Sequence, residues 1–172
     1  ILHKSGKVRD FGVSNQNPMM MELLKTAVKQ PLKVNQLQLS AAFTPSFEAG
    51  FHVNMEGPKA AVRDGSVFEY CRLNDTVIQA WSVLQHGYFK GNFVGNEEFA
   101  ALNHVLNDLA KKYHVTPTAI ALAWVLRYPG KMQAVIGTTK PQHVLEAAKA
   151  AEVTLTRKEW YQIYLAAGND LP

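Results

Sequence analysis

The amino-acid sequence predicts an α/β protein whose strands form a parallel sheet. Short apolar runs alternate four times with amphipathic segments of helical period along the 172 residues. Capping residues and prolines stand at the expected helix starts and mark the boundaries between the two kinds of segment. Strands that alternate with crossover helices pair in parallel, so we expect four parallel strands within a single region, residues 1–172.

The four expected strands are set apart by turn residues and prolines. The first ends at Ser14, the second begins directly after Pro31, and the third follows the Asn74-Asp75 turn. The fourth is a short apolar run that meets Gly137 and is expected to be buried. In chain order, these strands are expected at residues 8–14, 32–39, 76–81 and 134–137.

Each helix is expected to begin at a capping residue. Asn17 and Thr116 each precede a first-turn proline, and Asn96 precedes two glutamates. The remaining starts carry the Ser/Thr-x-x-Glu/Gln pattern of a capping box, at Ser66 with Glu69, Thr139 with Gln142 and Thr156 with Glu159. One helix is extra to the strand–helix repeat near the third crossover, and another closes the chain.

Two long loops are expected to carry function. Residues 41–64 and 85–95 are rich in glycine and phenylalanine and exceed the usual length of a connection. Their aromatic residues predict either an apolar mouth for a substrate or lids over the core, and they are Phe43, Phe51, Phe89 and Phe93. The substrate stays open at this stage.

Composition limits the classes of function. The chain is 47% hydrophobic and 19% charged, which fits one globular domain with a core. Its net charge of +4 comes from scattered basic residues, so no nucleic-acid partner is expected. The longest apolar run, residues 119–126, is too short to cross a membrane, and no signal peptide is visible. We expect a soluble, cytoplasmic protein.

Metal chemistry and nucleophilic catalysis find little support. Cys71 is the single cysteine, and it lies in a helical pattern without a nearby base. The six histidines lack the spacing of metal ligands, so no metal is expected. Neither a Gly-x-Ser-x-Gly elbow nor a Gly-x-Gly-x-x-Gly loop occurs. No catalytic residue is assigned.

The turn Gly137-Thr138-Thr139-Lys140 has the features of a phosphate site. It lies between an apolar run and the proline that opens a helix. The free backbone N–H groups and the positive dipole end of that helix attract an anion, and Lys140 adds a full charge. The alternative is an ordinary strand–turn–helix joint with a solvated lysine.

Other polar or aromatic side chains stand at the ends of the expected strands. Ser14 and Asn15 close the first strand, Gln36 lies on the second, and Trp81 and Ser82 close the third. The carboxyl ends of parallel strands lie at one edge of a sheet, where ligands bind. Together with the phosphate turn they predict a site for an extended nucleotide, although Trp81 or Gln36 alone is more often part of a core.

Four segments resemble the aldo-keto reductase family. They are residues 6–15 (Gly-Lys-Val-Arg-Asp-Phe-Gly-Val-Ser-Asn), 34–36 (Val-Asn-Gln), 80–84 (Ala-Trp-Ser-Val-Leu) and 136–141 (Ile-Gly-Thr-Thr-Lys-Pro). They occur in the family's order, and residues 155–161 resemble a bacterial subgroup of small oxidoreductases within it. The resemblance implies a (β/α)8 TIM barrel, of which this chain would be the C-terminal half with strands 5–8.

The resemblance also implies NADP(H) as cofactor. Ser14, Asn15 and Gln36 would hold the nicotinamide carboxamide, and Trp81 would stack under the nicotinamide ring. Ser82 and Leu84 would lie near the pyrophosphate. The 2′-phosphate would bind at the turn that follows Gly137, through Thr138, Thr139 and Lys140.

Two departures from the family pattern matter for the adenine site. His143 stands where the family often has an arginine stacked on the adenine. Glu146 keeps an acidic position of the family, whereas Ala147 replaces the usual asparagine. Histidine can stack, but it lacks the fixed charge and forked donors of arginine.

A further departure concerns catalysis. The family's catalytic aspartate, tyrosine, lysine and histidine precede the Gly-Val-Ser-Asn strand and have no counterpart in these 172 residues, which begin with Ile1 rather than methionine. We therefore expect a small-molecule carbonyl reductase as the complete protein and no activity from this segment alone. A missing N-terminal half or self-association would have to close the barrel. The alternatives are a non-catalytic nucleotide-binding or regulatory module and a phosphosugar-binding half barrel.

Overall fold

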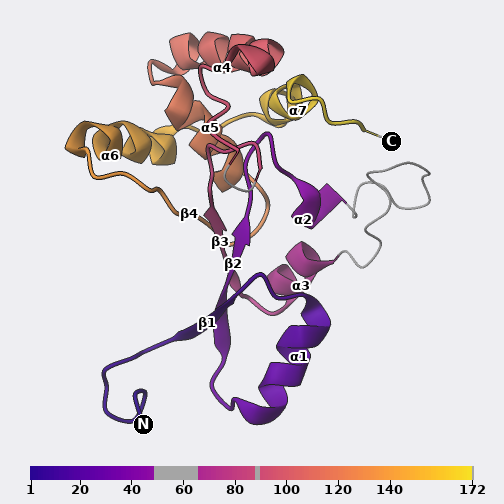
Figure 1. The fold of residues 1–172 in the computed structure, drawn as a ribbon, viewed down its shortest axis with the longest axis vertical. Helices are drawn as coiled ribbons and strands as arrows, with labels where there is room; N and C mark the ends of the chain where they lie inside the picture. The colour runs from indigo at the N-terminus through magenta and orange to yellow at the C-terminus, as the bar shows by residue number, and fades with distance from the viewer. Residues whose placement is uncertain (49–65, 88–89, 172) are drawn as a thin grey trace.

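A computed structural model describes residues 1–48, 66–87 and 90–171 of the chain. Its centre is a four-stranded parallel sheet in the order β1-β2-β3-β4, so strands that follow one another in the chain are neighbours in the sheet (Figure 1). The strands are β1 (Phe11–Ser14), β2 (Leu32–Gln38), β3 (Val77–Trp81) and β4 (Met132–Ala134). The predicted α/β class with a parallel sheet is confirmed.

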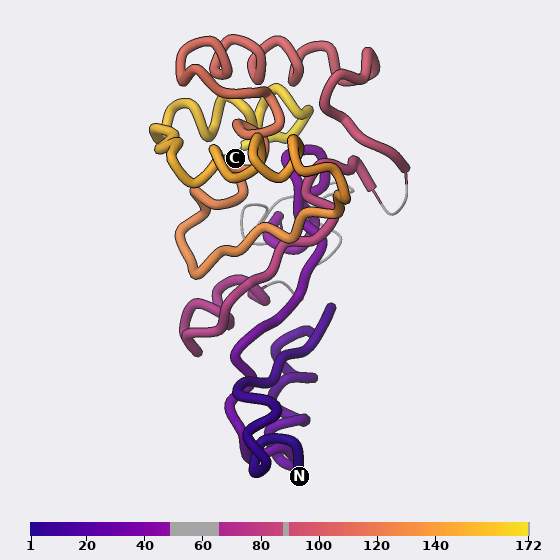
Figure 2. The backbone as a smooth tube through the Cα atoms, turned by 90° about the vertical axis from the view of Figure 1, so that its left-hand side faces the viewer, coloured from indigo at the N-terminus to yellow at the C-terminus, as the bar shows by residue number. Residues whose placement is uncertain are grey.

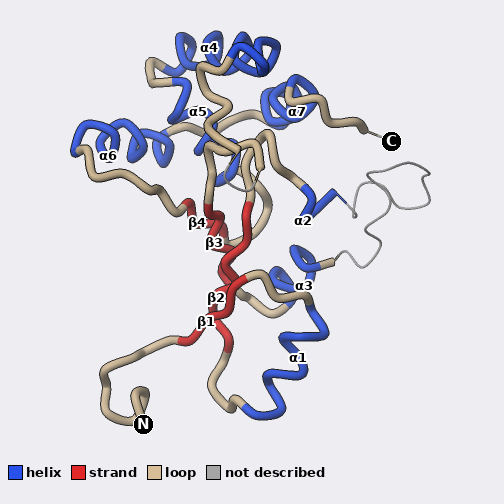
Figure 3. The backbone as a smooth tube through the Cα atoms, in the orientation of Figure 1, coloured by secondary structure: helices blue, strands red, loops and turns tan. Residues whose placement is uncertain are grey.

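The helices lie in two groups around the sheet. The first group, on one side of the strands in Figure 3, is α1 (Pro18–Ala27), α2 (Pro45–Glu48) and α3 (Val67–Leu73). The second group gathers beyond one end of the sheet, far from the N-terminus (Figures 1 and 2). It consists of α4 (Ala100–Tyr113), α5 (Pro117–Leu126), α6 (Pro141–Ala148) and α7 (Arg157–Ala166), with 3₁₀ turns η2 (Glu97–Phe99) and η3 (Lys149–Glu152).

The two faces of the sheet differ because side chains alternate along each strand. On the face that packs against helices, Ile78 and Ala80 of β3 are buried, as is Leu37 of β2. The opposite face carries a row of polar side chains in register, one from each strand: Ser14, Gln36, Gln79 and Gln133. The described residues leave this second face partly exposed.

The main core forms around α5, whose residues Ala119–Val125 are all buried. The indole rings of Trp124 and Trp160 stack with centroids 4.8 Å apart. Each indole Nε1 donates a hydrogen bond of 3.0 Å to the other residue's backbone carbonyl oxygen. This reciprocal pair satisfies both buried donors and joins α5 to α7.

Several predicted caps are confirmed. The side chains of Asn17, Asn96 and Thr116 each accept a hydrogen bond from a backbone N–H of the following turn. Thr156 and Glu159 form the expected capping box. Burial alone would raise the pKa of Glu159, but hydrogen bonds from Lys112, Thr156 and Tyr113 outweigh it and lower the pKa to about 2.

The other two capping boxes were predicted wrongly. Ser66 has a φ of 68°, so its side chain makes no cap hydrogen bond with α3. Helix α6 has Lys140 rather than Thr139 at its N-cap position, also without a side-chain cap. There the Thr138 hydroxyl oxygen instead accepts a hydrogen bond of 3.2 Å from the Lys140 backbone N–H. A local turn has replaced the expected capping box.

The fourth strand is shorter and earlier than expected. It covers Met132–Ala134 instead of residues 134–137. The Val135 N–H still donates to the Ala80 carbonyl oxygen of β3 at 2.8 Å. Two residues after Ala80, however, the backbone at Ser82 turns away from β4 with a φ of 52°. Val135 and Ile136 therefore leave the sheet and are 37% and 38% exposed, not buried.

The predicted loops are described only in part. Helix α2 interrupts the first loop, and residues 49–65, which include Phe51, lie outside the described residues, as does Phe89 of the second loop. Phe93 is fully buried in the core, which favours the core alternative for this residue. No helix in the described ranges is long and apolar enough to cross a membrane.

Candidate functional site

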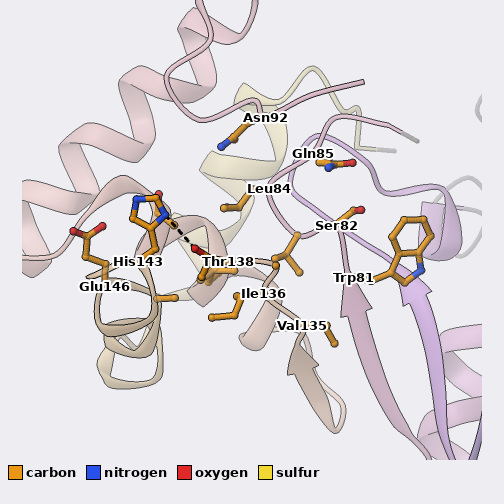
Figure 4. Close-up of a pocket in the computed structure, with 15 residues that line it drawn as sticks. Trp81, Ser82, Leu84, Gln85, Asn92, Val135, Ile136, Thr138, His143 and Glu146 are labelled. Carbon is orange, nitrogen blue, oxygen red and sulfur yellow. Dashed lines mark hydrogen bonds between the residues drawn. The ribbon is translucent and has the colours of Figure 1, made fainter. Parts of the chain in front are cut away.

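A cleft of about 560 Å³ lies at the carboxyl ends of β3 and β4. Its walls come from the segment after β3, from α5, from the segment between β4 and α6, and from α6 itself (Figure 4). Seven of the predicted site residues line it, and they are Trp81, Ser82, Leu84, Gly137, Thr138, His143 and Glu146. The structure thus brings together one group at β3 and another at the turn before α6, more than fifty residues apart in sequence.

The first wall is a tightly held turn after β3. Ser82 takes the left-handed backbone region, and its carbonyl oxygen accepts from the Gln85 N–H at 2.9 Å. Gln85 pairs with Asn92 in a short antiparallel bridge. The Asn103 side chain of α4 then fixes the following segment, because its amide donates to the carbonyl oxygens of Phe93, Asn96 and Phe99. The wall is therefore anchored to a helix.

The opposite wall is the start of α6. Thr138 Oγ1 and His143 Nδ1 face each other at 3.4 Å, and Figure 4 shows Glu146 on the far side of the imidazole. The Glu146 carboxylate accepts from the Gln142 amide at 2.9 Å. A hydroxyl, an imidazole and the first turn of a helix thus border the cleft at this wall. Such groups suit an anionic or polar ligand.

Trp81 lies at the end of the cleft away from α6 (Figure 4). It pairs in register with Gln38 of β2. Two buried amide atoms in this region, Gln38 Nε2 and Gln85 Oε1, have no hydrogen-bond partner among the described residues. A buried donor or acceptor without a partner is costly, and of the two residues only Gln85 lines the cleft.

The residues predicted to hold the nicotinamide carboxamide do not line the cleft. Ser14 and Gln36 border a separate hollow of about 440 Å³ on the exposed face of the sheet. Gln36 Nε2 donates to Gln79 Oε1 at 3.2 Å, and Gln79 Nε2 donates to Gln133 Oε1 at 2.8 Å. Ser14 Oγ and the Asn15 N–H both donate to the Gln36 carbonyl oxygen. These polar groups are bonded to one another in this structure.

Three predicted residues line neither hollow. Asn15 is exposed at the end of β1 with a φ of 54°, and Thr139 and Lys140 lie at the edge of the cleft turn. Lys140 is exposed at the N-cap position of α6, where its ammonium group adds charge beside Thr138.

Sequence reasoning missed part of the cleft. Gln85, Asn92 and Thr118 line it, and Gln79 belongs to the amide row that holds Gln36. Gln79 could have been found, because it lies two residues before Trp81 and so shares its face of the strand. Thr118 carries no such signal, since only the packing of α5 brings it to the cleft.

The ionisable groups with shifted pKa values lie elsewhere. Burial raises the pKa of Tyr164, Tyr128 and Tyr113, and none of these side chains lines the cleft. Within the described ranges, no group of three His, Cys, Asp or Glu side chains is placed to hold a metal ion. The ionisable side chains that line the cleft are His143 and Glu146.

Comparison with known proteins shows that the chain is similar to bacterial oxidoreductases. The chain is 34% identical over 169 residues to a 6-dehydroglucose reductase of Agrobacterium fabrum, covering 97% of this chain and 50% of that protein. It is 31% identical over 173 residues to the oxidoreductase YdhF of Escherichia coli, covering 99% of this chain and 51% of that protein. The chain therefore spans about half the length of the curated relatives it matches.

A solved structure shares the fold. An aldo-keto reductase from Klebsiella pneumoniae in complex with NADPH superposes with a TM-score of 0.68 at 22% identity, covering 94% of this chain and 49% of that one. The model of the aldo/keto reductase family matches residues 1–166. With nearly its whole length matched, the chain belongs to the aldo/keto reductase family.

Proposed function

We propose that this chain is the cofactor-binding part of an NADP(H)-dependent oxidoreductase that acts on a small aldehyde or ketone. We also propose that residues 1–172 correspond to the C-terminal half, strands 5–8, of a (β/α)8 barrel. Family membership supports the first statement. The half-length match and the order β1-β2-β3-β4, with β1 and β4 at the edges, support the second.

One observation carries the proposal: Trp81 and Ser82 share a single cleft with Thr138 and His143. An aromatic ring at one end of the cleft, with a hydroxyl and an imidazole at the other, suits a ligand with a flat ring at one end and a phosphate at the other (Figure 4). The Gln85 side chain adds an amide to the lining of the same cleft. These features support the proposal of a dinucleotide ligand.

Each residue has a role in this proposal. Trp81 packs against the nicotinamide, Ser82 and Leu84 lie along the pyrophosphate, and His143 packs against the adenine beside Glu146. The 2′-phosphate is held where the chain leaves Gly137, by Thr138, Thr139 and Lys140. Ser14, Asn15 and Gln36 hold the carboxamide, and Gln36 Nε2 donates to Gln79 in this structure. Bound NADPH supplies hydride for carbonyl reduction.

The chain by itself should not turn over a carbonyl substrate. Reduction requires a proton donor near the carbonyl oxygen, and the described cleft holds no tyrosine or lysine among its lining residues. The proton donor would come from the other half of the barrel in the complete protein.

The charge of Lys140 provides the test. Reversing it with Lys140→Glu places a carboxylate beside the proposed 2′-phosphate, which should weaken NADPH binding about tenfold or more. NADH lacks this phosphate and should lose far less affinity. Fluorescence titration of the 172-residue chain with each nucleotide measures both values.

Lys29→Glu is the matched control. It makes the same charge change at an exposed residue that precedes the amino end of β2. The cleft lies at the other end of the strands, at their carboxyl ends. NADPH affinity should be unchanged in this variant. Equal losses for NADPH and NADH in Lys140→Glu would rule out the 2′-phosphate assignment.

A further inference from the structure

A second pocket lies away from the cofactor cleft. It has a volume of about 310 Å³ and lies where α3, the segment after α5 and the start of α7 meet. Figure 1 shows α3 and α7 on one side of the strands and α6, which borders the cleft, on the other. No residue lines both hollows, so the pocket is a separate site.

Arginine is concentrated at this pocket. The chain has five arginines, and Arg63 lies outside the described residues. Of the other four, Arg72, Arg127 and Arg157 all line the pocket, whereas no described lysine does. The three guanidinium groups come from α3, from the end of α5 and from the start of α7, so folding alone brings them together.

None of these guanidinium groups forms an ion pair with a carboxylate among the described residues. The ion pairs that join two described residues use lysine or histidine as the cation, and none includes an arginine. Glu69 lines the pocket but forms no ion pair there with a described residue. Arg127 is oriented by a hydrogen bond of 3.0 Å from its Nε to the Leu155 carbonyl oxygen, which leaves its terminal nitrogens available. With three arginines and one glutamate in its lining, the pocket carries a net positive charge.

The pocket also has aromatic walls. The Trp160 and Tyr161 rings meet edge to face at 5.1 Å, and the Arg157 guanidinium lies 5.8 Å from the Tyr161 ring centroid. Tyr128 packs edge-on against Phe68 at 4.8 Å. Burial, together with the negative charge of Glu69, raises the pKa of Tyr128 to about 12. Its hydroxyl stays protonated and can donate a hydrogen bond.

We propose that this pocket binds a small aromatic anion, in which a phosphate or carboxylate group is attached to a planar ring. Guanidinium groups are suited to such anions because their forked donors match two oxygens at once. The ring would pack on Tyr161, which is partly exposed beside the guanidinium groups, while Trp160 is buried beneath it in its stack with Trp124 and Tyr164. Neither the charge nor the ring contacts involve the cofactor cleft.

Titration of the 172-residue chain with phenyl phosphate tests this proposal. Calorimetry should show saturable binding, and tryptophan fluorescence should change because Trp160 lines the pocket. The double variant Arg72→Gln/Arg157→Gln should bind at least about tenfold more weakly. Arg127 is left intact because it also bonds to the backbone of Leu155. Circular dichroism checks folding, and the single variant Arg157→Gln gives a second measurement with a smaller loss.

Two controls separate the outcomes. Arg9→Gln removes the described arginine that does not line the pocket and should bind phenyl phosphate like the unaltered chain. Benzyl alcohol, which has the ring without the anion, and inorganic phosphate, which has the anion without the ring, should both bind more weakly than phenyl phosphate. Absence of saturable binding in the millimolar range, or equal affinity in the double variant, would overturn the proposal. So would a loss confined to Lys140→Glu, since phenyl phosphate would then occupy the cofactor cleft.

Discussion

Gly12 shows how one residue controls the approach of two strands. It belongs to β1 and lies opposite Val34 of β2. A Cβ atom built on Gly12 would come within 2.8 Å of the Val34 Cβ and 3.0 Å of its carbonyl oxygen, because the neighbouring backbone is so close. The Gly-Val-Ser-Asn motif therefore needs glycine for packing, independently of any ligand.

Gly12→Ala should destabilise the chain by about 1–3 kcal/mol, since the contact forces a backbone shift. Chemical denaturation followed by circular dichroism measures the change in the free energy of unfolding. Gly137→Ala is the matched control, because a Cβ there meets nothing within 4 Å and should change stability little. Similar stability of the two variants would contradict the strand-contact argument.

Asn35 and Gln36 are adjacent amide side chains with different roles in the structure. Asn35 is fully buried, and its amide donates to the Gln16 carbonyl oxygen at 2.8 Å, so it anchors the segment after β1. Gln36, the next residue, points to the opposite face and joins the amide row through Gln79. Their order in the sequence does not reveal which amide is structural, because the strand alternation and the neighbouring strands decide it.

At the scale of elements, Thr139 and Thr156 carry nearly the same capping pattern and behave differently. Thr156 and Glu159 form both hydrogen bonds of the capping box, and Lys112 and Tyr113 of α4 hold the glutamate in place. Thr139 makes no cap, since the N-cap position of α6 lies one residue later, at Lys140, and the helix begins at Pro141. Tertiary contacts to Glu159 thus support one box, whereas Gln142 instead pairs with Glu146 along its own helix.

Substitution at these two threonines should therefore have unequal effects. Thr156→Ala removes a side-chain acceptor and leaves the buried Glu159 with fewer donors, so it should cost about 1–2 kcal/mol. Thr139→Ala should leave stability almost unchanged. Thermal or chemical unfolding of both variants gives the comparison, and equal destabilisation would indicate that Thr139 does cap α6.

At the scale of the whole molecule, the sheet has two open edges. Among the described strands, β1 pairs only with β2 and β4 only with β3. The row from Ser14 to Gln133 lies on the face that the described helices leave partly exposed. Unpaired edges and an uncovered face are unfavourable in water and favour pairing with further chain.

The 172-residue chain on its own should accordingly associate. Native mass spectrometry and sedimentation should detect species larger than 19.1 kDa that shift with concentration. A dye that fluoresces on apolar surface should bind at low protein concentration and be released on association. A monodisperse 19.1 kDa monomer with cooperative unfolding and no dye binding would contradict the half-barrel proposal.

The sequence by itself determined the elements and their class. Apolar periodicity, prolines and caps such as Asn17 and Thr116 are local signals, because they depend on contacts within one or two turns. They predicted the α/β class and parallel strands, which the structure confirms. The strand-end and turn residues also indicated Trp81 and Thr138, and the family resemblance indicated His143; the structure brings all three into one cleft.

Only the tertiary structure decided the remaining features. The early end of β4 depends on the turn at Ser82 in a neighbouring segment, and the Trp124–Trp160 pair depends on helices far apart in the chain. The separation of Gln36 from the cleft and the gathering of three arginines at the second pocket depend equally on long-range packing. The physical reason is that burial, strand register and convergence of side chains arise between segments, so no local pattern encodes them.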